Sequence, residues 1–235
     1  MKRHNIHIHS TFSDGRLSIE EIAVRATGLE VIGISDHAYT TKLPSSLQVN
    51  GKLDAYIAEL EKVQHLHPEI KILKGLEIDS HRYSGTNPLG LPFDQVNRFD
   101  YVLFEQVSLG TFGDRSIYDL IEARPYLHCA VGLAHNDMQI NFDSHEREVA
   151  KLLTELDIFV DINQSEIGAE GIGGNTRLGL DYFHYFSPEL LGAMREYGVK
   201  VAIGTDAHAG QSILLIDEAY HFIEQHHLLP HPLIQ

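Results

Sequence analysis

Two histidines separated by one residue, His7 and His9, are the first groups in the chain that could do chemistry. Side chains alternate along a β-strand, so this spacing places both imidazoles on the same face of a strand. Two neighbouring imidazoles form half of a typical transition-metal site. Because the chain contains 16 histidines, chance could produce one such pair, and the interpretation depends on the residues that accompany it.

Further polar residues follow other predicted strands at the points where those strands end. They are Asp36 with His37, Glu77, His135, Asn163, and Asp206 with His208. In a parallel α/β barrel the carboxyl ends of the strands meet at one mouth, where active sites form. The histidines and carboxylates exceed the ligands of one tetrahedral ion, which predicts two or three divalent ions bridged by Glu77. A mixture of imidazole and carboxylate ligands favours Zn, Mn or Fe.

Strand-like and helix-like segments that must position these residues alternate along the chain. Strands are predicted over about 4–9, 31–35, 70–78, 101–107, 130–134, 158–162 and 199–204. Helices are predicted after a capping box at Ser18 and over about 54–67, 116–124, 143–156, 188–197 and 213–226. The alternation predicts an α/β fold, either a barrel or a doubly wound parallel sheet. No repeat or linker divides the sequence, so we expect one domain over residues 1–235.

Composition limits the class of protein. A hydrophobic content of 43% and a charged content of 22% are typical of a soluble globular protein. Cys129 is the only cysteine, which excludes disulfides and thiolate-rich metal sites. The net charge of −15 disfavours a nucleic-acid partner. No membrane-length apolar run and no leader-like segment is present, so we expect a cytoplasmic protein with no membrane partner; the sequence leaves the oligomeric state open.

Several short motifs, in order, resemble those of the PHP (polymerase and histidinol phosphatase) family. The motifs are His7-Ile8-His9-Ser10, Ser13-Asp14-Gly15, Ile34-Ser35-Asp36-His37, Gly75-Leu76-Glu77, Ala134-His135 and Gly204-Thr205-Asp206-Ala207-His208. The resemblance implies a single-domain, distorted seven-stranded (β/α)7 TIM-like barrel with up to three metals and phosphoester hydrolysis. Members of this family include histidinol-phosphate phosphatases, nucleotide phosphoesterases and a domain of bacterial replicative polymerases.

The same resemblance implies a role for each ligand. One metal would be held by four residues, which are His7, His9, Glu77 and Asp206. Glu77 would bridge to a second metal that is also bound by His135. Asp14, His37 and His208 would hold a third. Asp36 would orient the ligand that it precedes, His37, rather than bind a metal itself.

One family motif is missing from this chain. The family usually has a histidine just after strand four, and an ungapped alignment places that position at Val107. Either Glu105 substitutes as a ligand after a small shift, or the second metal site is weak or empty. An ordinary glutamate at the end of a strand is an equally good interpretation of Glu105.

These residues predict hydrolysis of the phosphate monoester of a small metabolite, which resembles either histidinol phosphate or a nucleotide. A metal-activated hydroxide would attack phosphorus in line. Asp206, His208 and Glu77 would be catalytic as ligands beside the reacting group. Arg16, Arg177 and Arg82 would bind the phosphate, because their loops border the mouth. The general acid stays open between a metal-ligating side chain and water.

Three other functions remain as alternatives. A catalytically weakened metal-binding scaffold or regulatory module would explain the missing histidine. A nuclease is compatible with the family resemblance, but the acidic charge and the lack of a basic groove disfavour it. A metal-dependent amidohydrolase would normally have a lysine at the end of a middle strand, and none lies at a predicted strand end here.

Overall fold

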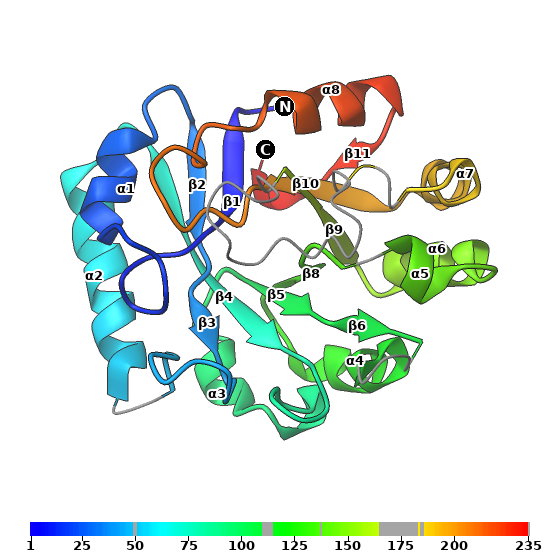
Figure 1. Ribbon diagram of the computed structural model, residues 1–235, viewed down its shortest axis with the longest axis horizontal. Helices are drawn as coiled ribbons and strands as arrows, with labels where there is room; N and C mark the ends of the chain where they lie inside the picture. The colour runs from blue at the N-terminus through cyan, green and yellow to red at the C-terminus, as the bar shows by residue number, and fades with distance from the viewer. Residues whose placement is uncertain (49–50, 110–114, 137, 165–182, 184–185, 235) are drawn as a thin grey trace.

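The structure is a computed structural model that describes residues 1–235 except 49–50, 110–114, 137, 165–182, 184–185 and 235. Its centre is a curled sheet of parallel strands, one for each strand expected from the sequence (Figure 1). In spatial order these strands are β1 (His4–Ile8), β2 (Val31–Ile34), β4 (Lys71–Asp79), β5 (Tyr101–Glu105), β8 (Ala130–Leu133), β9 (Ile158–Asn163) and β10 (Lys200–Gly204). β2, β5 and β8 have mostly apolar sequences, which suit strands that are buried on both faces, whereas β1 also buries His4, Asn5 and His7.

Short strands extend or flank this sheet. β11 (Leu229–Pro230) pairs with β10, and β3 (His37–Ala38) pairs with the second half of β4. β6 (Val107–Ser108) and β7 (Arg115–Ser116) form a separate two-stranded sheet. β6 includes the position where the family pattern would place a histidine, and its Val107 side chain is fully buried among apolar residues.

The sheet closes into a barrel where β1 meets β10. Ile8 forms a bridge with Ala207, and the His9 N–H donates to the Ala207 carbonyl at 2.9 Å. At the opposite end of the strands, the Ile203 N–H donates to Nε2 of the His4 ring at 2.9 Å. A side chain thus takes the place of a backbone hydrogen bond between β1 and β10, and the barrel is distorted there. The expected seven-stranded TIM-like barrel is confirmed.

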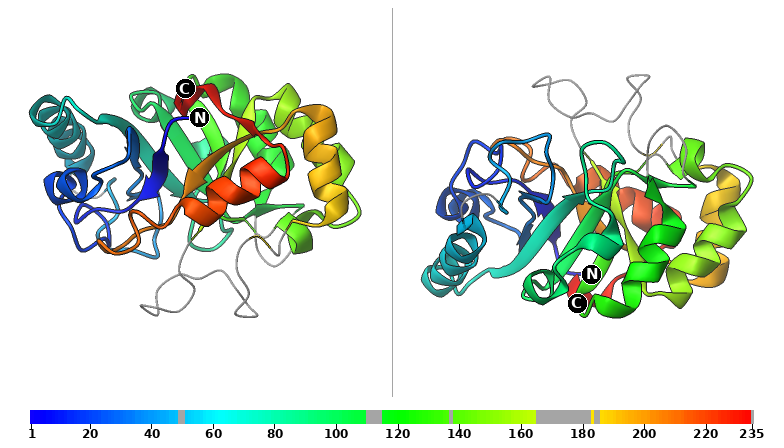
Figure 2. Two further views of the ribbon diagram at one scale, coloured as in Figure 1. Left: turned by 90° about the horizontal axis from the view of Figure 1, so that it is seen from above. Right: turned by 90° about the horizontal axis from the view of Figure 1, so that it is seen from below.

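Helices surround the barrel on its outer side (Figure 1, Figure 2). They are α1 (Ile19–Arg25), α2 (Lys52–Leu66), α3 (Phe93–Val96), α4 (Ile117–Ala123), α5 (Met138–Phe142), α6 (Glu146–Glu155), α7 (Pro188–Tyr197) and α8 (Asp217–Gln225). Short 3-10 turns cover Pro88–Gly90, Arg124–Tyr126 and Pro232–Ile234. Within the described part of the chain, none of the helices has the length and apolar character needed to cross a membrane.

Helix ends follow the local signals in some places and not in others. The capping box at Ser18 is present, because its hydroxyl accepts from the Glu21 N–H while Glu21 caps Ser18. The helix expected over 143–156 begins at Glu146, and the helix expected over 213–226 begins at Asp217. Ile213 is buried in the core before α8 starts. Packing of that side chain overrides the local helical pattern.

The floor of the barrel is a small apolar cluster that lies between the strands. It contains Ile6, Val31, Leu73, Tyr101, Leu103, Ala134, Phe159, Ala202 and Ile234. The Tyr101 hydroxyl donates to the Ile6 carbonyl across the interior. Gly33 and Gly75 make room for this ring, since a Cβ on either would lie 2.2 Å from a Tyr101 atom. The filled floor confines any chemistry to the end of the barrel where the polar residues lie.

Candidate metal centre

The carboxyl ends of the barrel strands surround a cavity of about 200 Å³. It is lined by Asp14, His37, Thr40, Lys42, Leu43, Glu77, Glu105, His135, Asp206 and His208. His7 and His9 lie next to these residues and are almost fully buried. All eight metal ligands expected from the sequence therefore meet in one place.

Four of these side chains form a first group, which contains His7, Glu77, His135 and Asp206. One ligand atom from each lies within 4.8 Å of those from the other three. Glu77 Oε1 lies 3.2 Å from His7 Nε2 and 3.1 Å from His135 Nε2. Asp206 Oδ1 lies 3.5 Å from His7 Nε2. These atoms can converge on one divalent ion.

A second group has the same property and contains His9, Asp14, His37 and His208. Asp14 Oδ2 lies 3.3 Å from His208 Nε2 and 3.6 Å from His37 Nε2. Asp14 Oδ1 lies 3.6 Å from His9 Nδ1. Two imidazoles face the same carboxylate oxygen, and a third faces its other oxygen, which suits a second ion.

The two groups touch through Glu77. Its Oε2 lies 3.3 Å from His9 Nε2 and 3.2 Å from His37 Nδ1, while Oε1 faces the first group. His9 Nε2 also lies 3.0 Å from Asp206 Oδ1. His9 therefore stands between the groups, with one ring nitrogen towards each. The resemblance placed His9 with His7, Glu77 and Asp206, and its Nε2 does face that set.

Several buried polar atoms at this centre have no hydrogen-bond partner among the described residues. They are His7 Nε2, both ring nitrogens of His9, His37 Nδ1, His135 Nδ1 and Glu77 Oε2. An unpaired buried polar atom is costly, so such a set calls for a partner. Imidazole nitrogens and carboxylate oxygens are the ligands of Zn, Mn and Fe. The residues present fit divalent metal ions.

Charges alternate across the centre. Burial opposes a proton on His7, but Glu77 and Asp161 outweigh it and raise the pKa of His7 to about 10. Burial also opposes a proton on His135, but Glu77 and Asp206 outweigh it and raise the pKa of His135 to about 9. Although burial opposes their ionisation, the facing imidazoles hold the pKa of Asp14 and Asp206 well below the usual range. A bound cation would take the place of the ring protons between these carboxylates.

Asp161 is a functional residue that the sequence reasoning missed. Its Oδ2 lies 2.7 Å from His7 Nδ1 and accepts from Asn163 Nδ2 at 2.9 Å, all within the barrel. This contact holds the His7 proton on Nδ1 and directs Nε2 towards Glu77. Gly204 leaves the space, because a Cβ there would lie 2.3 Å from Asp161 Oδ1. An ionisable residue inside the apolar segment 158–162 was the available signal.

Asp36 orders a loop. It is fully buried, and its carboxylate accepts from the backbone N–H and hydroxyl groups of Ser10 and Ser13. Since Asp14 follows Ser13 directly, these bonds fix the loop that presents the Asp14 ligand. The sequence predicted that Asp36 orients the residue that follows it, His37; the contacts of its carboxylate are instead with the loop before Asp14.

The end of β5 differs from the family pattern in an unexpected way. Glu105 pairs in register with Asp79 of β4, and the Lys42 ammonium lies between the two carboxylates. Burial raises the pKa of Glu105, and the neighbouring charge of Glu77 adds to the shift. Glu105 belongs to neither ligand group found among the described residues. Glu105 instead forms an ion pair with Lys42.

The arginines expected to bind phosphate are placed differently from the metal ligands. Arg16 and Arg82 are exposed, and neither lines the cavity. The backbone N–H of Arg16 donates to the His208 carbonyl at 2.9 Å, which ties its loop to the centre. Arg177 lies outside the described residues.

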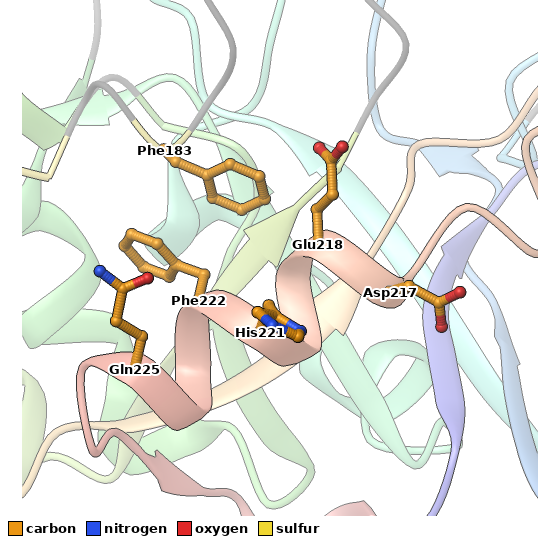
Figure 3. Close-up of a pocket in the computed structure, with 6 residues that line it drawn as sticks. All are labelled: Phe183, Asp217, Glu218, His221, Phe222 and Gln225. Carbon is orange, nitrogen blue, oxygen red and sulfur yellow. The ribbon is translucent and has the colours of Figure 1, made fainter.

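A larger cavity, about 490 Å³, lies along α8 (Figure 3). It is lined by Phe183, Asp217, Glu218, His221, Phe222 and Gln225. None of these residues belongs to a ligand group in the described part of the chain. Size therefore does not identify the reactive site, and the smaller cavity holds the groups that could do chemistry.

Comparisons with known proteins identify the family of this chain. The PHP domain family model matches residues 5–157. A "Probable phosphatase" of Caldicellulosiruptor bescii is 26% identical over 199 residues, which are 81% of this chain and 73% of that protein. The DNA polymerase/3'-5' exonuclease PolX of Bacillus subtilis is 32% identical over 77 residues, or 32% of this chain and 13% of that protein. The solved structure of a proposed histidinol phosphatase from Listeria monocytogenes superposes with a TM-score of 0.61 at 16% identity, covering 93% of this chain and 100% of that one. This structural likeness shows a shared fold.

Proposed function

Because the chain belongs to the PHP domain family and is a metal-dependent phosphatase, we propose that its substrate is the phosphate monoester of a small metabolite. One observation carries this proposal: two groups of four ligands meet at Glu77 beside a single small cavity. A cavity of about 200 Å³ has room for a phosphoryl group and leaves most of a leaving group outside. We also propose that the domain extends beyond residue 157, since Asp206 and His208 complete the two groups.

His7, Glu77, His135 and Asp206 would hold one ion, and His9, Asp14, His37 and His208 would hold another. Two ions are the number that the two groups support, and a third would need Glu105 to exchange Lys42 for a metal. Zn, Mn and Fe suit these ligands. When bound, such ions would polarise the phosphoryl oxygens and lower the pKa of water.

The protein's own residues keep these ligands ready. His208 Nδ1 lies 2.8 Å from the Asp206 backbone carbonyl, so it holds the proton and leaves Nε2 directed at Asp14. Asp161 does the same for His7. Fixed ring orientations of this kind reduce the reorganisation needed when substrate enters.

Two kinds of metabolite are the leading candidates for the leaving group. The resemblance to the PHP family suggests histidinol phosphate and nucleotides. The likeness to the Listeria monocytogenes protein supports the fold alone, so it does not choose between them. The choice requires a direct assay.

The test is phosphate release from a panel of phosphomonoesters that includes histidinol phosphate and nucleoside phosphates. Chelator-stripped protein is assayed before and after addition of Mn, Zn or Fe. We expect release only with metal, and only from monoesters that fit the mouth of the cavity. Metal-loaded protein that releases no phosphate from any monoester would contradict the proposal and favour the alternative of a metal-binding scaffold.

A further inference from the structure

Among the described residues, the lining of this cavity includes one side chain that carries a permanent positive charge. Lys42 is the only lysine or arginine among the described residues that line it. Its side chain is 36% exposed, so the ammonium can reach a bound molecule. Four carboxylates line the same cavity, from Asp14, Glu77, Glu105 and Asp206. A phosphate entering this site needs positive charge from every available source.

The position of Lys42 is fixed by two carboxylates. Its Nζ lies 3.1 Å from Asp79 Oδ2 and 3.3 Å from Glu105 Oε1. Asp79 and Glu105 are a register pair at the ends of β4 and β5, so both anchors belong to the barrel wall. An ammonium has three donors, which is one more than these two contacts use.

The loop that carries Lys42 is also held in place. Asp79 is fully buried and accepts from the hydroxyls of Thr40 and Ser84 at 2.9 Å and 2.8 Å. The Lys42 N–H donates to the Thr40 hydroxyl at 3.1 Å, and the Thr41 N–H donates to the Ser84 carbonyl at 2.7 Å. One buried carboxylate thus joins the loop after β3 to the loop after β4. The lysine is preorganised at the mouth.

We propose that the Lys42 ammonium binds a phosphoryl oxygen of the substrate on the side of the cavity formed by β4 and β5. This inference rests on the proposed hydrolysis of a phosphate monoester and names a substrate-binding residue of the same site. Glu105, the partner of Lys42, lies two residues before Val107, where the family pattern would place a histidine. A fixed ammonium therefore supplies positive charge at the end of β5, where this chain lacks that histidine.

The test compares Lys42→Met with Lys42→Arg and with Lys62→Met, an exposed lysine of α2 that serves as the matched control. Affinity for inorganic phosphate is measured by calorimetry on metal-loaded protein, and metal content per chain is measured in parallel. We expect Lys42→Met to weaken phosphate binding by about tenfold or more, as expected for loss of a charge-assisted hydrogen bond. Metal content should stay at the wild-type level, and Lys42→Arg should restore part of the affinity.

A double variant separates the loss of phosphate binding from destabilisation of the site by unbalanced charge. Removal of Lys42 leaves Glu105 beside Asp79 without a counter-charge, so the double variant Lys42→Met with Glu105→Gln removes that repulsion. It should keep the weakened phosphate affinity and show a raised KM for the phosphomonoester with a smaller change in kcat, since lost ground-state binding appears in KM.

The outcomes separate the two proposals. Wild-type phosphate affinity in folded Lys42→Met and in the double variant overturns the role of Lys42, whatever the turnover. If wild-type protein binds phosphate through Lys42 but hydrolyses no monoester, the proposed function fails and the binding site stands. If metal-loaded wild-type protein neither binds phosphate nor hydrolyses a monoester, both are wrong.

Discussion

Single residues at this centre are held in conformations that suit ligation. His135 and Asp206, which are candidate ligands in the first group, have positive φ angles of 24° and 50°. Residues other than glycine adopt this region rarely, and such strain concentrates at functional sites. The surrounding barrel imposes the backbone shape, and the side chains then point into the cavity. A residue substituted at either position must therefore tolerate a positive φ angle.

Loss of one ligand should remove activity without unfolding the protein. We expect His9→Ala and Asp206→Asn each to lower kcat/KM by about 10³-fold or more, since the metals supply several kcal/mol of transition-state stabilisation. Asparagine tolerates the left-handed backbone at Asp206. Circular dichroism and phosphate release are the measurements, with His65→Ala on the surface of α2 as control. Wild-type turnover in either folded ligand variant would contradict the assignment.

Asp161 should act through His7. We expect Asp161→Asn to weaken metal binding by about 10- to 100-fold, because the partner that orients the imidazole is lost. Competition with a chromogenic chelator measures this affinity directly. Asp157→Asn, a half-exposed aspartate just before the same strand, is the matched control. Equal metal affinity in the two variants would show that Asp161 has no positioning role.

Pairs of strands build the floor on which the centre rests. Tyr101 enters the barrel from β5 and lies against β2 and β4 at two glycines, Gly33 and Gly75. The Tyr101 ring is fully buried and fills the barrel interior beside these two glycines. Its hydroxyl also satisfies the Ile6 carbonyl of β1. Three strands, β1, β2 and β4, thus pack against the Tyr101 side chain.

A methyl group at the floor should destabilise the barrel. In Gly75→Ala the new Cβ would lie 2.2 Å from the Tyr101 ring, and we expect a loss of about 1–3 kcal/mol in the free energy of unfolding. Gly192→Ala in α7 is the control, because its Cβ meets nothing within 4 Å. That change should stabilise the helix by up to about 1 kcal/mol. Urea unfolding curves measure both, and equal stabilities would contradict the packing argument.

The barrel is closed by contacts between β1 and the segment that begins with β10. The candidate ligands run from His7 to His208, so the centre is complete only when β1 and β10 are side by side. His4 contributes to that closure through its Nε2, which accepts the Ile203 N–H, while its Nδ1 lies 2.8 Å from the Lys2 carbonyl. The neutral ring has one donor and one acceptor nitrogen, which matches these two partners.

Acid should therefore weaken the folded state. Burial lowers the pKa of His4 to about 4, despite the opposing effects of the Lys2 carbonyl and the Asp161 charge. Because the unfolded ring titrates near 6.5, the unfolded state binds protons more readily. The contribution of neutral His4 to stability is complete above pH 6.5 and is lost as the pH falls from 6.5 towards 4. The loss is at most about 3 kcal/mol.

The measurement is the free energy of unfolding between pH 4 and pH 7 for wild type and His4→Gln. Glutamine can still accept the Ile203 N–H but does not titrate, so its stability should depend less on pH in this range. Tyr220, whose hydroxyl lies 3.0 Å from His4 Nδ1, stays neutral throughout this range, since even an ordinary tyrosine titrates near 10 and burial raises the pKa of Tyr220 to about 12. Parallel curves for the two proteins would exclude His4 as the source of the slope.

The sequence by itself predicted the strands and the candidate ligands, and its resemblance to the PHP family implied the barrel. Hydrophobic segments and strand-end positions are local properties, so His7, His9, Glu77 and His135 could be assigned to one mouth before any contact was known. The same local rules failed at the start of α8, where the packing of Ile213 decided the boundary.

Only the tertiary structure decided how these residues group and what supports them. Whether His9 faces Asp14 or Asp206 depends on distances between strands and loops, which spacing along the chain does not contain. Lys42 reaches Glu105 because β4 and β5 are in a register that pairs Asp79 with Glu105. Contacts between distant segments arise from packing of the whole barrel, and that packing is the physical reason why the sequence alone could not reveal them.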